Sequence, residues 1–328
     1  LVTKAGPRHR VGVVVHVGST RPHIMVSGKM IGLRPKTKVI LPQILAGLLS
    51  TSAIQEFLNT RTTGMAESQT NFADEALLAT RLNVPPMCEQ RRIAAVLDMV
   101  DDQIAIFKRI LAKLRLEMEG VRDDLIGALP PDAFFPLADL CVADICYGIV
   151  QSGGYVAEGV PVLAIRDLGG DFATGVHRTS KSIDAQYRRS RVASGDVLLS
   201  IKGTIGRVGV APEYYVGNIS REIARLRFAP RVDSNFARQY LLSRAAQRRL
   251  DLAVVGTTRA EISIHVLKRF SFPAPDIAIQ YRIAEAMNEL ERRIDAERNA
   301  LEKLQAVRRG LFEDLLTGGV RVPLERAS

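Results

Sequence analysis

The 328-residue chain contains no tryptophan, and aromatic residues make up only 5% of it. Proteins that bind single-stranded nucleic acid stack its bases on aromatic side chains, so this class of ligand is poorly supported. Only three cysteines occur, Cys88, Cys141 and Cys146, with no CxxC pair and no histidine nearby at metal-ligand spacing. We therefore expect unpaired thiols in a reducing compartment, with neither a disulfide nor a zinc site.

Long apolar runs are missing as well, since none approaches the roughly 18 residues needed to span a bilayer. The first residues, Leu1-Val2-Thr3-Lys4, show no secretory signal pattern, and we expect a cytoplasmic protein. The apolar content of 47% is sufficient for packed cores. The length suits two domains and their connectors.

Two segments of the chain that lie 190 positions apart repeat each other. Gln90–Ala94 reads QRRIA and Gln280–Ala284 reads QYRIA, and identities at the same offset continue as far as Asp124-Leu125 and Asp314-Leu315. Chance does not produce such a match. We interpret the chain as a tandem duplication in which each copy is a variable domain followed by a long helix.

Each repeated segment carries apolar residues at two interleaved positions of a seven-residue period, which is typical of helices that pair along their length. The first seam comprises Ile93, Leu97, Val100, Ile104, Phe107, Leu111, Leu114, Met118, Val121 and Leu125. The second comprises Ile283, Met287, Leu290, Ile294, Leu301, Leu304, Leu311 and Leu315, and Glu297 and Arg308 interrupt it.

These seams predict two antiparallel helices of about 40 residues, each about 60 Å long at 1.5 Å per residue. Such a coiled coil would be a rigid spacer. The alternative is a pair of ordinary core helices in a bundle, although bundle helices rarely keep this period over five heptads. Pro130-Pro131 is expected to end the first helix and Gly318-Gly319 the second.

The positive charge is unevenly divided along the chain. Residues 1–88 carry a net charge of +6 and residues 137–272 a net charge of +7, whereas the segments 89–128 and 273–328 are each −1. Arginine supplies 16 of the 19 cations in residues 137–272. A solvated surface should not prefer one kind of segment, whereas a phosphate-binding surface should, so duplex DNA is the expected partner.

Residues 137–272 show short β-type runs broken by glycines, which predict a mixed domain with a strongly bent sheet. The runs are Val160–Ile165, Asp196–Ile201, Val208–Val210 and Ile223–Phe228, and one helix is expected near residues 234–251. Gly203-Thr204-Ile205-Gly206 is expected to form a tight hairpin with glycines at positive φ. It lacks the Gly-Lys-Ser/Thr ending of a phosphate loop.

Several of these motifs follow the order and spacing of a target recognition domain, and the chain resembles the specificity subunit of a type I restriction-modification system. The motifs are Gly148–Gln151, Gly159–Leu163, Gly195–Leu198, Gly203–Gly206, Gly256–Thr258 and Pro273–Ile283. Pro85-Pro86 with Glu89–Ala94, and the terminal Leu315–Gly318, look like the repeated start of the helix and its end in that family. The likeness covers nearly the whole chain.

The resemblance implies an α+β fold in which two target recognition domains are separated by two long antiparallel helices. It predicts a partial first recognition domain over 1–85, a first conserved helix over 86–130, a complete second recognition domain over 131–272, and a second conserved helix with a tail over 273–328. Each recognition domain would read one half of a split DNA sequence.

The resemblance also implies partners. The paired helices would fix the unread spacer of the DNA and dock two methyltransferase subunits, and restriction subunits would join the full complex. The subunit itself would do no chemistry, in keeping with the absence of an Asn/Asp-Pro-Pro-Tyr/Phe methylation motif and of a Walker A lysine. S-adenosylmethionine, ATP and Mg would belong to the partner subunits.

The sequence departs from this family at its beginning. Aligning Arg10–Val13 with Arg207–Val210 indicates that the first domain lacks a counterpart of roughly residues 137–196, and further along Leu48–Ser50 is aligned with Leu241–Ser243. We expect that the second domain reads its half-site while the partial first domain reads nothing on its own.

The residues expected to contact DNA are cationic or polar and lie in turns or at strand ends. The first set is Lys202, Thr204, Arg207, Thr257, Thr258 and Arg259, and the second is Arg166, Arg178, Arg188, Arg189 and Arg191. Two other functions are considered. A coiled-coil adaptor that does not bind DNA would leave the basic excess unexplained, and a self-sufficient DNA-modifying enzyme lacks catalytic and cofactor motifs.

Overall fold

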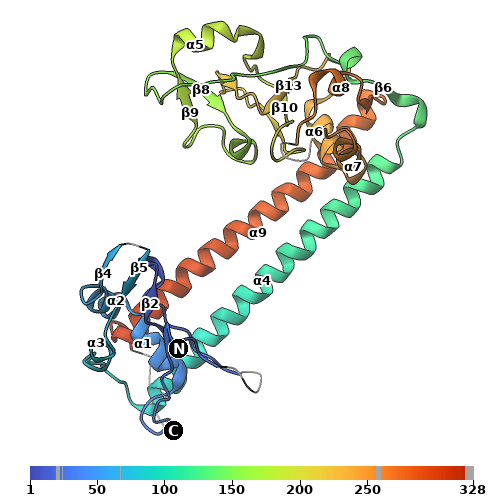
Figure 1. Ribbon diagram of the computed structural model, residues 1–328. Helices are drawn as coiled ribbons and strands as arrows, with labels where there is room; N and C mark the ends of the chain where they lie inside the picture. Colours follow the sequence, from blue (N-terminus) through green and yellow to red (C-terminus); the bar gives the residue numbers. More distant parts are fainter. Residues whose placement is uncertain (20–22, 24, 67, 256–259, 322–328) are drawn as a thin grey trace. The chain divides into compact units, whose positions relative to one another are not determined.

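The computed structural model describes residues 1–19, 23, 25–66, 68–255 and 260–321 (Figure 1). The chain forms two compact units, Leu1–Leu111 with Ala296–Ser328, and Ala112–Asp295. We call them the first and the second unit and describe each by itself. Within the described residues, no helix is both long and apolar enough to cross a membrane.

Two long helices contribute to both units, as the heptad pattern predicts. Helix α4 spans Met87–Gly127 and α9 spans Ile277–Thr317, and each has 41 residues. The chain leaves α9 through Gly318, whose φ of +78° lies in the left-handed region that glycine adopts without strain. Each of the 18 seam residues is buried or half-buried.

Ion pairs of the first unit show that its segments of α4 and α9 run antiparallel. Arg308 donates to both carboxylate oxygens of Asp101, each at 3.0 Å, and Arg321 donates to Glu89 at 2.7 Å. Glu89 precedes Asp101 in α4, whereas its partner Arg321 follows Arg308, so the two segments run in opposite directions. Arg308, which interrupts the apolar seam, finds its charge partner on the opposite helix.

The second unit contains two small sheets and one further pair of strands that are distant in the sequence. The first sheet has the strand order β11-β10-β13-β7 and is antiparallel throughout, and in the second, β12-β8-β9, β8 and β12 are parallel. The strands are β6 (Phe134–Pro136), β7 (Cys146–Tyr147), β8 (Val160–Leu163), β9 (His177–Thr179), β10 (Val197–Ser200), β11 (Val208–Val210), β12 (Asn218–Ile219), β13 (Ile223–Leu226) and β14 (Ser271–Pro273). Strand β14 pairs with β6.

The helices of the second unit are α5 (Lys181–Gln186), α6 (Ser234–Leu242), α7 (Arg244–Leu252) and α8 (Ile264–Lys268), and the 3₁₀ turns are η2 (Pro131–Ala133), η3 (Leu137–Leu140), η4 (Ile165–Gly169) and η5 (Arg188–Ser190). Helices α6 and α7 lie beside this unit's segments of α4 and α9, whereas α5 lies near β8 and β9, away from the long helices (Figure 1). One core cluster joins Phe236, Tyr240 and Phe272 to Ile283 and Met287 of α9.

The single helix expected near 234–251 is wrong, because the chain forms α6 and α7 with a break at Ser243. Ser243 has the extended angles φ −67° and ψ 152°, and its hydroxyl accepts a hydrogen bond from the amide of Ala246 at 3.2 Å. A serine that caps a helix in this way starts a new helix.

The first unit contains a smaller set of elements, packed on the start of α4 and the end of α9. Its strands are β1 (Val2–Thr3), β2 (Ala5–Gly6), β3 (Met30–Ile31), β4 (Thr63–Ala66) and β5 (Gln69–Asn71), and its short helices are η1 (Arg8–Arg10), α1 (Pro42–Ser50), α2 (Ser52–Asn59) and α3 (Asp74–Leu78). Strand β1 pairs with β3, and the other three form a sheet in the order β2-β5-β4.

A buried glutamine ties the start of α4 to the first unit. The side chain of Gln90 accepts a hydrogen bond from the amide of Leu41 at 2.8 Å and donates to the carbonyls of Val39 at 2.9 Å and Pro85 at 2.8 Å. Its exposed fraction is 0%. The amide group of one side chain therefore satisfies three backbone groups that would otherwise lack partners.

The repeated glutamine makes the same three bonds at the start of α9 in the second unit. Gln280 accepts from the amide of Asp233 at 2.9 Å and donates to the carbonyls of Arg231 at 2.9 Å and Pro275 at 2.7 Å. It is also fully buried. The duplication read from QRRIA and QYRIA thus extends to individual hydrogen bonds.

A second pair of glutamines shows how the two variable domains correspond. Gln55 donates from Nε2 to the carbonyl of Gly12 at 3.0 Å, and Gln247 donates to Gly206 at 3.0 Å. Both glycines have a φ of +85°, where a side chain is strained, and a Cβ on Gly206 would collide with Gln247. Gly12 is therefore the counterpart of Gly206.

This correspondence corrects both alignments of the variable domains. Matching Arg10–Val13 to Arg207–Val210 places Gly12 three residues too late, because the preceding turn is longer in the first unit. Thr51 and Ser243 each lie at the break between two helices, and each donates from its hydroxyl to a carbonyl three residues earlier, Leu48 at 2.8 Å and Tyr240 at 2.7 Å. The match of Leu48–Ser50 to Leu241–Ser243 is therefore shifted by one residue.

We predict that Gln280→Ala lowers the free energy of unfolding of the second unit by about 3 kcal/mol, because a buried amide and two carbonyls lose their partner. Hydrogen exchange of the segment around Asp233 should accelerate by about two orders of magnitude. Gln103→Ala, on an exposed face of α4, is the matched control and should change little. Unchanged protection in Gln280→Ala would refute the anchoring role.

Candidate nucleic-acid interface

The turn between β10 and β11 presents two of the predicted DNA-contacting residues. The strands pair antiparallel, and Gly203 and Gly206 have φ values of +71° and +85°, so the predicted glycine hairpin is confirmed. Thr204 and Arg207 are exposed, and among the described residues neither side chain has a hydrogen-bond or charge partner. They are free to bind a ligand.

Lys202, at the base of this turn, is partly occupied by an internal ion pair. Its ammonium lies 2.8 Å from the carboxylate of Glu261 and 5.9 Å from the ring centre of Tyr147. A backbone bridge between Lys202 and Glu261 brings the turn beside the residues that flank 256–259. The predicted contacts Thr257, Thr258 and Arg259 themselves lie outside the described residues.

Arg166 lies in the 3₁₀ turn η4, which is next to the glycine turn. The side chain of the preceding Ile165 approaches within 3.9 Å of the place where a Cβ on Gly203 would lie, so η4 is adjacent to the glycine turn. The Arg166 side chain is 69% exposed and only 3.4 Å from one oxygen of Asp167. At this exposure its ion pair is weak, and the guanidinium can exchange it for a phosphate.

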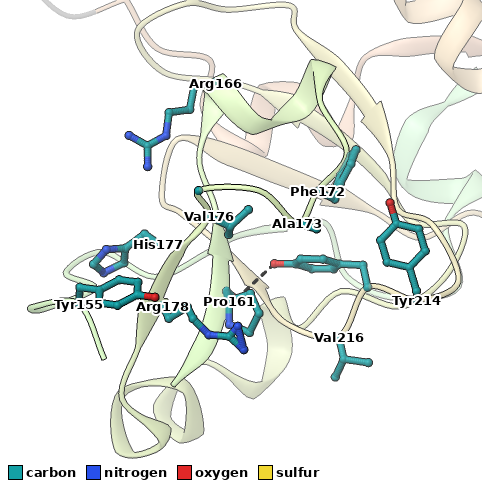
Figure 2. Close-up of a pocket in the computed structure, with 12 residues that line it drawn as sticks. Tyr155, Pro161, Arg166, Phe172, Ala173, Val176, His177, Arg178, Tyr214 and Val216 are labelled. Carbon is teal, nitrogen blue, oxygen red and sulfur yellow. Dashed lines mark hydrogen bonds between the residues drawn. The ribbon is translucent and has the colours of Figure 1, made fainter. Parts of the chain in front are cut away.

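A cavity of about 550 Å³ lies beside Arg166 (Figure 2). Arg166, His177 and Tyr155 lie on one side of it, and Tyr214 and Phe172 on the other. Arg178, which also lines it, donates from Nε to the carbonyl of Gly159 at 3.2 Å. None of the residues that line the cavity carries a carboxylate. This composition favours an anionic ligand.

The sequence pattern did not predict that aromatic residues line this cavity. Tyr155 is 64% exposed and meets the ring of His177 edge to face with centroids 6.1 Å apart. The buried Nε2 of His177 has no hydrogen-bond partner among the described residues. The low aromatic content of the whole chain concealed this local group, which the pair Tyr214-Tyr215 could have suggested.

Arg191 serves the fold rather than the surface. Its Nε donates to Asp184 at 2.9 Å, and Asn218 donates to the other oxygen of that carboxylate at 3.0 Å. Asp184 is only 2% exposed. Burial alone would raise the pKa of Asp184, but the hydrogen bonds from Arg191 and Asn218 outweigh it and hold the pKa below its usual value.

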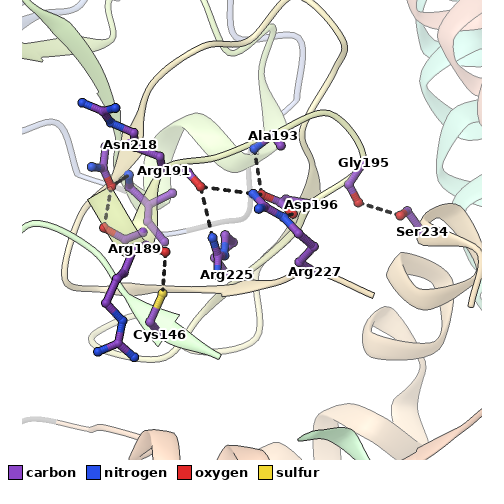
Figure 3. Close-up of polar contacts among 12 residues, drawn as sticks. Cys146, Arg189, Arg191, Ala193, Gly195, Asp196, Asn218, Arg225, Arg227 and Ser234 are labelled. Atoms are coloured by element: carbon purple, nitrogen blue, oxygen red, sulfur yellow. Dashed lines mark hydrogen bonds and ion pairs between the residues drawn. The ribbon is translucent and has the colours of Figure 1, made fainter. Parts of the chain in front are cut away.

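Two further arginines stabilise the same region (Figure 3). Arg227 donates twice to the buried carboxylate of Asp196, at 2.7 Å each, and this bond raises the pKa of Arg227. Arg225 is 5% exposed and donates to the carbonyl of Arg191 at 3.2 Å and to that of Asp144 at 3.0 Å. Part of the arginine excess of residues 137–272 is therefore structural, and the net charge alone overstates the cationic surface.

The remaining predicted arginines lie at the edge of this network. Arg189 is 80% exposed and pairs with Asp144 at 3.0 Å. Arg188 is exposed on η5, and no described residue accepts a hydrogen bond from it. Of the described arginines predicted to contact DNA, Arg207, Arg166 and Arg188 thus have the fewest or weakest internal partners.

The family described as type I restriction modification DNA specificity domain matches residues 14–116 and 134–306, which is most of the chain. This protein belongs to that family. The predicted resemblance and the predicted fold class are thereby confirmed, and the family connects the chain with DNA sequence specificity.

Curated relatives and a solved structure agree with this assignment. The chain is 25% identical over 252 residues to the type I restriction enzyme EcoBI specificity subunit of Escherichia coli, a match that covers 67% of this chain and 53% of the relative. It is 23% identical to the type I restriction enzyme MjaVIII specificity subunit of Methanocaldococcus jannaschii, over 91% of this chain and 75% of the relative. The match thus spans about half of the first relative and three quarters of the second.

A solved structure titled as the basis of complex assembly and conformational transition of the type I R-M system has the same fold. It superposes with a TM-score of 0.59 at 20% identity and covers 88% of this chain and 74% of that one. At this identity the likeness concerns the fold alone.

We predict that Arg191→Ala lowers the melting temperature by about 5 °C, because the buried carboxylate of Asp184 loses its cation. Since the folded-state pKa of Asp184 is depressed, its contribution to stability is present above about pH 4 and is lost as the pH falls through the folded pKa. The difference between wild type and variant should therefore shrink on acidification. Thermal unfolding measured from pH 7 to pH 3 tests this.

Arg221→Ala is the control, since it removes the same charge from an exposed site of the second unit and Arg221 is not among the groups that depress the pKa of Asp184. It should leave the melting temperature nearly unchanged. Equal melting temperatures for Arg191→Ala and Arg221→Ala would contradict the structural role of Arg191.

Proposed function

We propose that the protein is the DNA-recognition subunit of a type I restriction-modification complex and reads a bipartite duplex sequence. The observation that carries the proposal is that Arg207, beside Thr204, is exposed and has no partner among the described residues, and that Arg166, in a weak exposed ion pair, lies on the adjacent turn η4 beside the carboxylate-free cavity. Guanidinium groups exposed in this way can bind the phosphates and guanine edges of duplex DNA. The duplicated units supply one reader for each half of the target.

We assign the spacing and docking of partners to α4 and α9. The seam residues of both helices are buried or half-buried. By contrast, the large apolar residues Met99, Ile106 and Ile110 of α4 are 63%, 37% and 38% exposed. The helical period places these three residues on one face, where a helix of another subunit could pack. We propose that two methyltransferase subunits dock on the paired helices and that restriction subunits complete the complex.

We further propose that the chain itself is not catalytic. S-adenosylmethionine, ATP and Mg would be bound by the methyltransferase and restriction subunits, and the complex would act in the cytoplasm, where it meets DNA. Methyl transfer to duplex DNA should then require the added methyltransferase subunit. Methyl transfer by the purified chain alone would contradict this division of labour.

The exposed apolar face of α4 is equally compatible with a coiled-coil adaptor that binds no DNA. The two functions differ in their dependence on salt. DNA binding releases counterions, so its affinity falls steeply as salt rises, whereas an apolar helix contact is nearly insensitive to salt.

We predict that Arg207→Ala weakens binding to a duplex that the wild-type chain selects from a random pool. The slope of log affinity against log salt should become shallower by about 0.9, the value for one phosphate contact. Arg269→Ala removes the same charge from another exposed position of the second unit and should leave the slope near the wild-type value.

Two results would count against this prediction in different ways. An unchanged slope in Arg207→Ala would remove this residue from the interface. No measurable duplex binding by the wild-type chain in the presence of methyltransferase subunits would overturn the proposed function as a whole.

A further inference from the structure

The first unit contains a basic turn, in residues 8–10, that is not among the motifs predicted to bind DNA. Arg8, His9 and Arg10 form the 3₁₀ turn η1 between Gly6 and Gly12. All three are exposed, and among the described residues none has an ion pair or a side-chain hydrogen bond. The guanidinium groups of Arg8 and Arg10 therefore concentrate positive charge on one short turn, with the His9 imidazole between them in the sequence.

This turn occupies the place of the glycine turn of the second unit. Gly6 pairs with Thr70 across β2 and β5, and Gly203 donates its amide to the carbonyl of Ala260 at the corresponding position. At the other end, Gln55 and Gln247 hold the carbonyls of the two positive-φ glycines. Both ends of the two turns are therefore fixed by equivalent bonds.

The two turns differ in length and in charge. Between its glycines the second unit has only Thr204 and Ile205, whereas the first unit has the five residues Pro7–Val11. Val11 is 4% exposed and fills the inward place of Ile205. The added residues thus extend outward, and they are the basic ones.

The bonds that shape the turn do not involve residues 137–196 of the second unit. They come from Gln247, Ala260 and the carbonyl of Ser200, which accepts from Gly206 at 3.0 Å. In the first unit Gly12 donates to the carbonyl of Thr3 at 2.8 Å in the same way. The described residues of the first unit therefore supply the bonds that hold its turn.

We propose that Arg8, His9 and Arg10 form a second duplex-DNA contact site, equivalent in place to the turn of Thr204 and Arg207. The site replaces the expectation that the first domain reads nothing on its own. It rests on the proposed function, because the two turns are equivalent and only the second carries residues predicted to bind DNA.

The chemistry of the turn fits phosphate and base edges. Two guanidinium groups can each bind a phosphate or a guanine edge in bidentate fashion, and Pro7, with φ −56°, fixes the start of the turn before DNA arrives. A turn already held in place loses little conformational entropy on binding. The longer first turn should therefore contribute more phosphate contacts than the second.

The double variant Arg8→Ala/Arg10→Ala tests the site in the full-length chain. With the selected duplex, the slope of log affinity against log salt should become shallower by about 1.8, the value for two phosphate contacts. Lys36→Ala/Lys38→Ala is the control, because it removes the same charge from exposed positions of the same unit. It should leave the slope near that of the wild type.

The outcomes separate this site from the proposed function. If the wild-type chain and Arg207→Ala behave as proposed but the Arg8/Arg10 double variant keeps the wild-type slope, only the second site is overturned. Equal losses in both double variants would also overturn it, since the charge would then act diffusely. Circular dichroism of each variant checks that the fold is intact.

Discussion

The buried glutamine at the start of each long helix is the interaction on which both units depend. Gln90 and Gln280 are fully buried, and each joins three backbone groups of a variable domain and its connector to a helix. An apolar contact could hold the same surfaces together, but it would leave these backbone groups unpaired and would fix no register. The glutamine therefore sets where each variable domain stands on its helix.

The same constraint explains why the variable domains can differ while their turns remain in place. Gln55 and Gln247 also fix the backbone with a side-chain amide, because they donate to the carbonyls of Gly12 and Gly206. The exposed side chains between these fixed points, Thr204 in one turn and Arg8, His9 and Arg10 in the other, make no hydrogen bonds or ion pairs among the described residues. Sequence can vary at these exposed positions at little cost in stability, which is what a recognition surface needs.

The sequence predicted the elements whose signals are local in the chain. The heptad seams predicted α4 and α9, and the two glycines predicted the hairpin, because both signals arise from local backbone geometry. The helix near 234–251 was predicted as one piece, since only the capping bond of Ser243 reveals its break. The alignment of Gly12 failed because a three-residue extension of a turn leaves no periodic trace.

The net charge of the sequence was the weakest guide to which arginines are available for DNA. Arg191 and Arg227 are indistinguishable in sequence from Arg207, yet they pair with the buried carboxylates of Asp184 and Asp196. These pairs form between different elements of the folded chain, so no local rule separates structural arginines from free ones. The cavity beside Arg166 was missed for the same reason, since its aromatic residues come from separate segments.

Site-specific crosslinking tests most directly whether both units present a turn to DNA. Cysteine replaces His9 in one variant and Thr204 in another, and the native Cys88, Cys141 and Cys146 are changed to serine. A photoactivatable group is attached to the new cysteine, and each variant is irradiated in complex with the selected duplex. We predict crosslinks from both positions, at two separate segments of one duplex. Crosslinks from position 204 alone, with none from position 9, would contradict a DNA contact by the first unit.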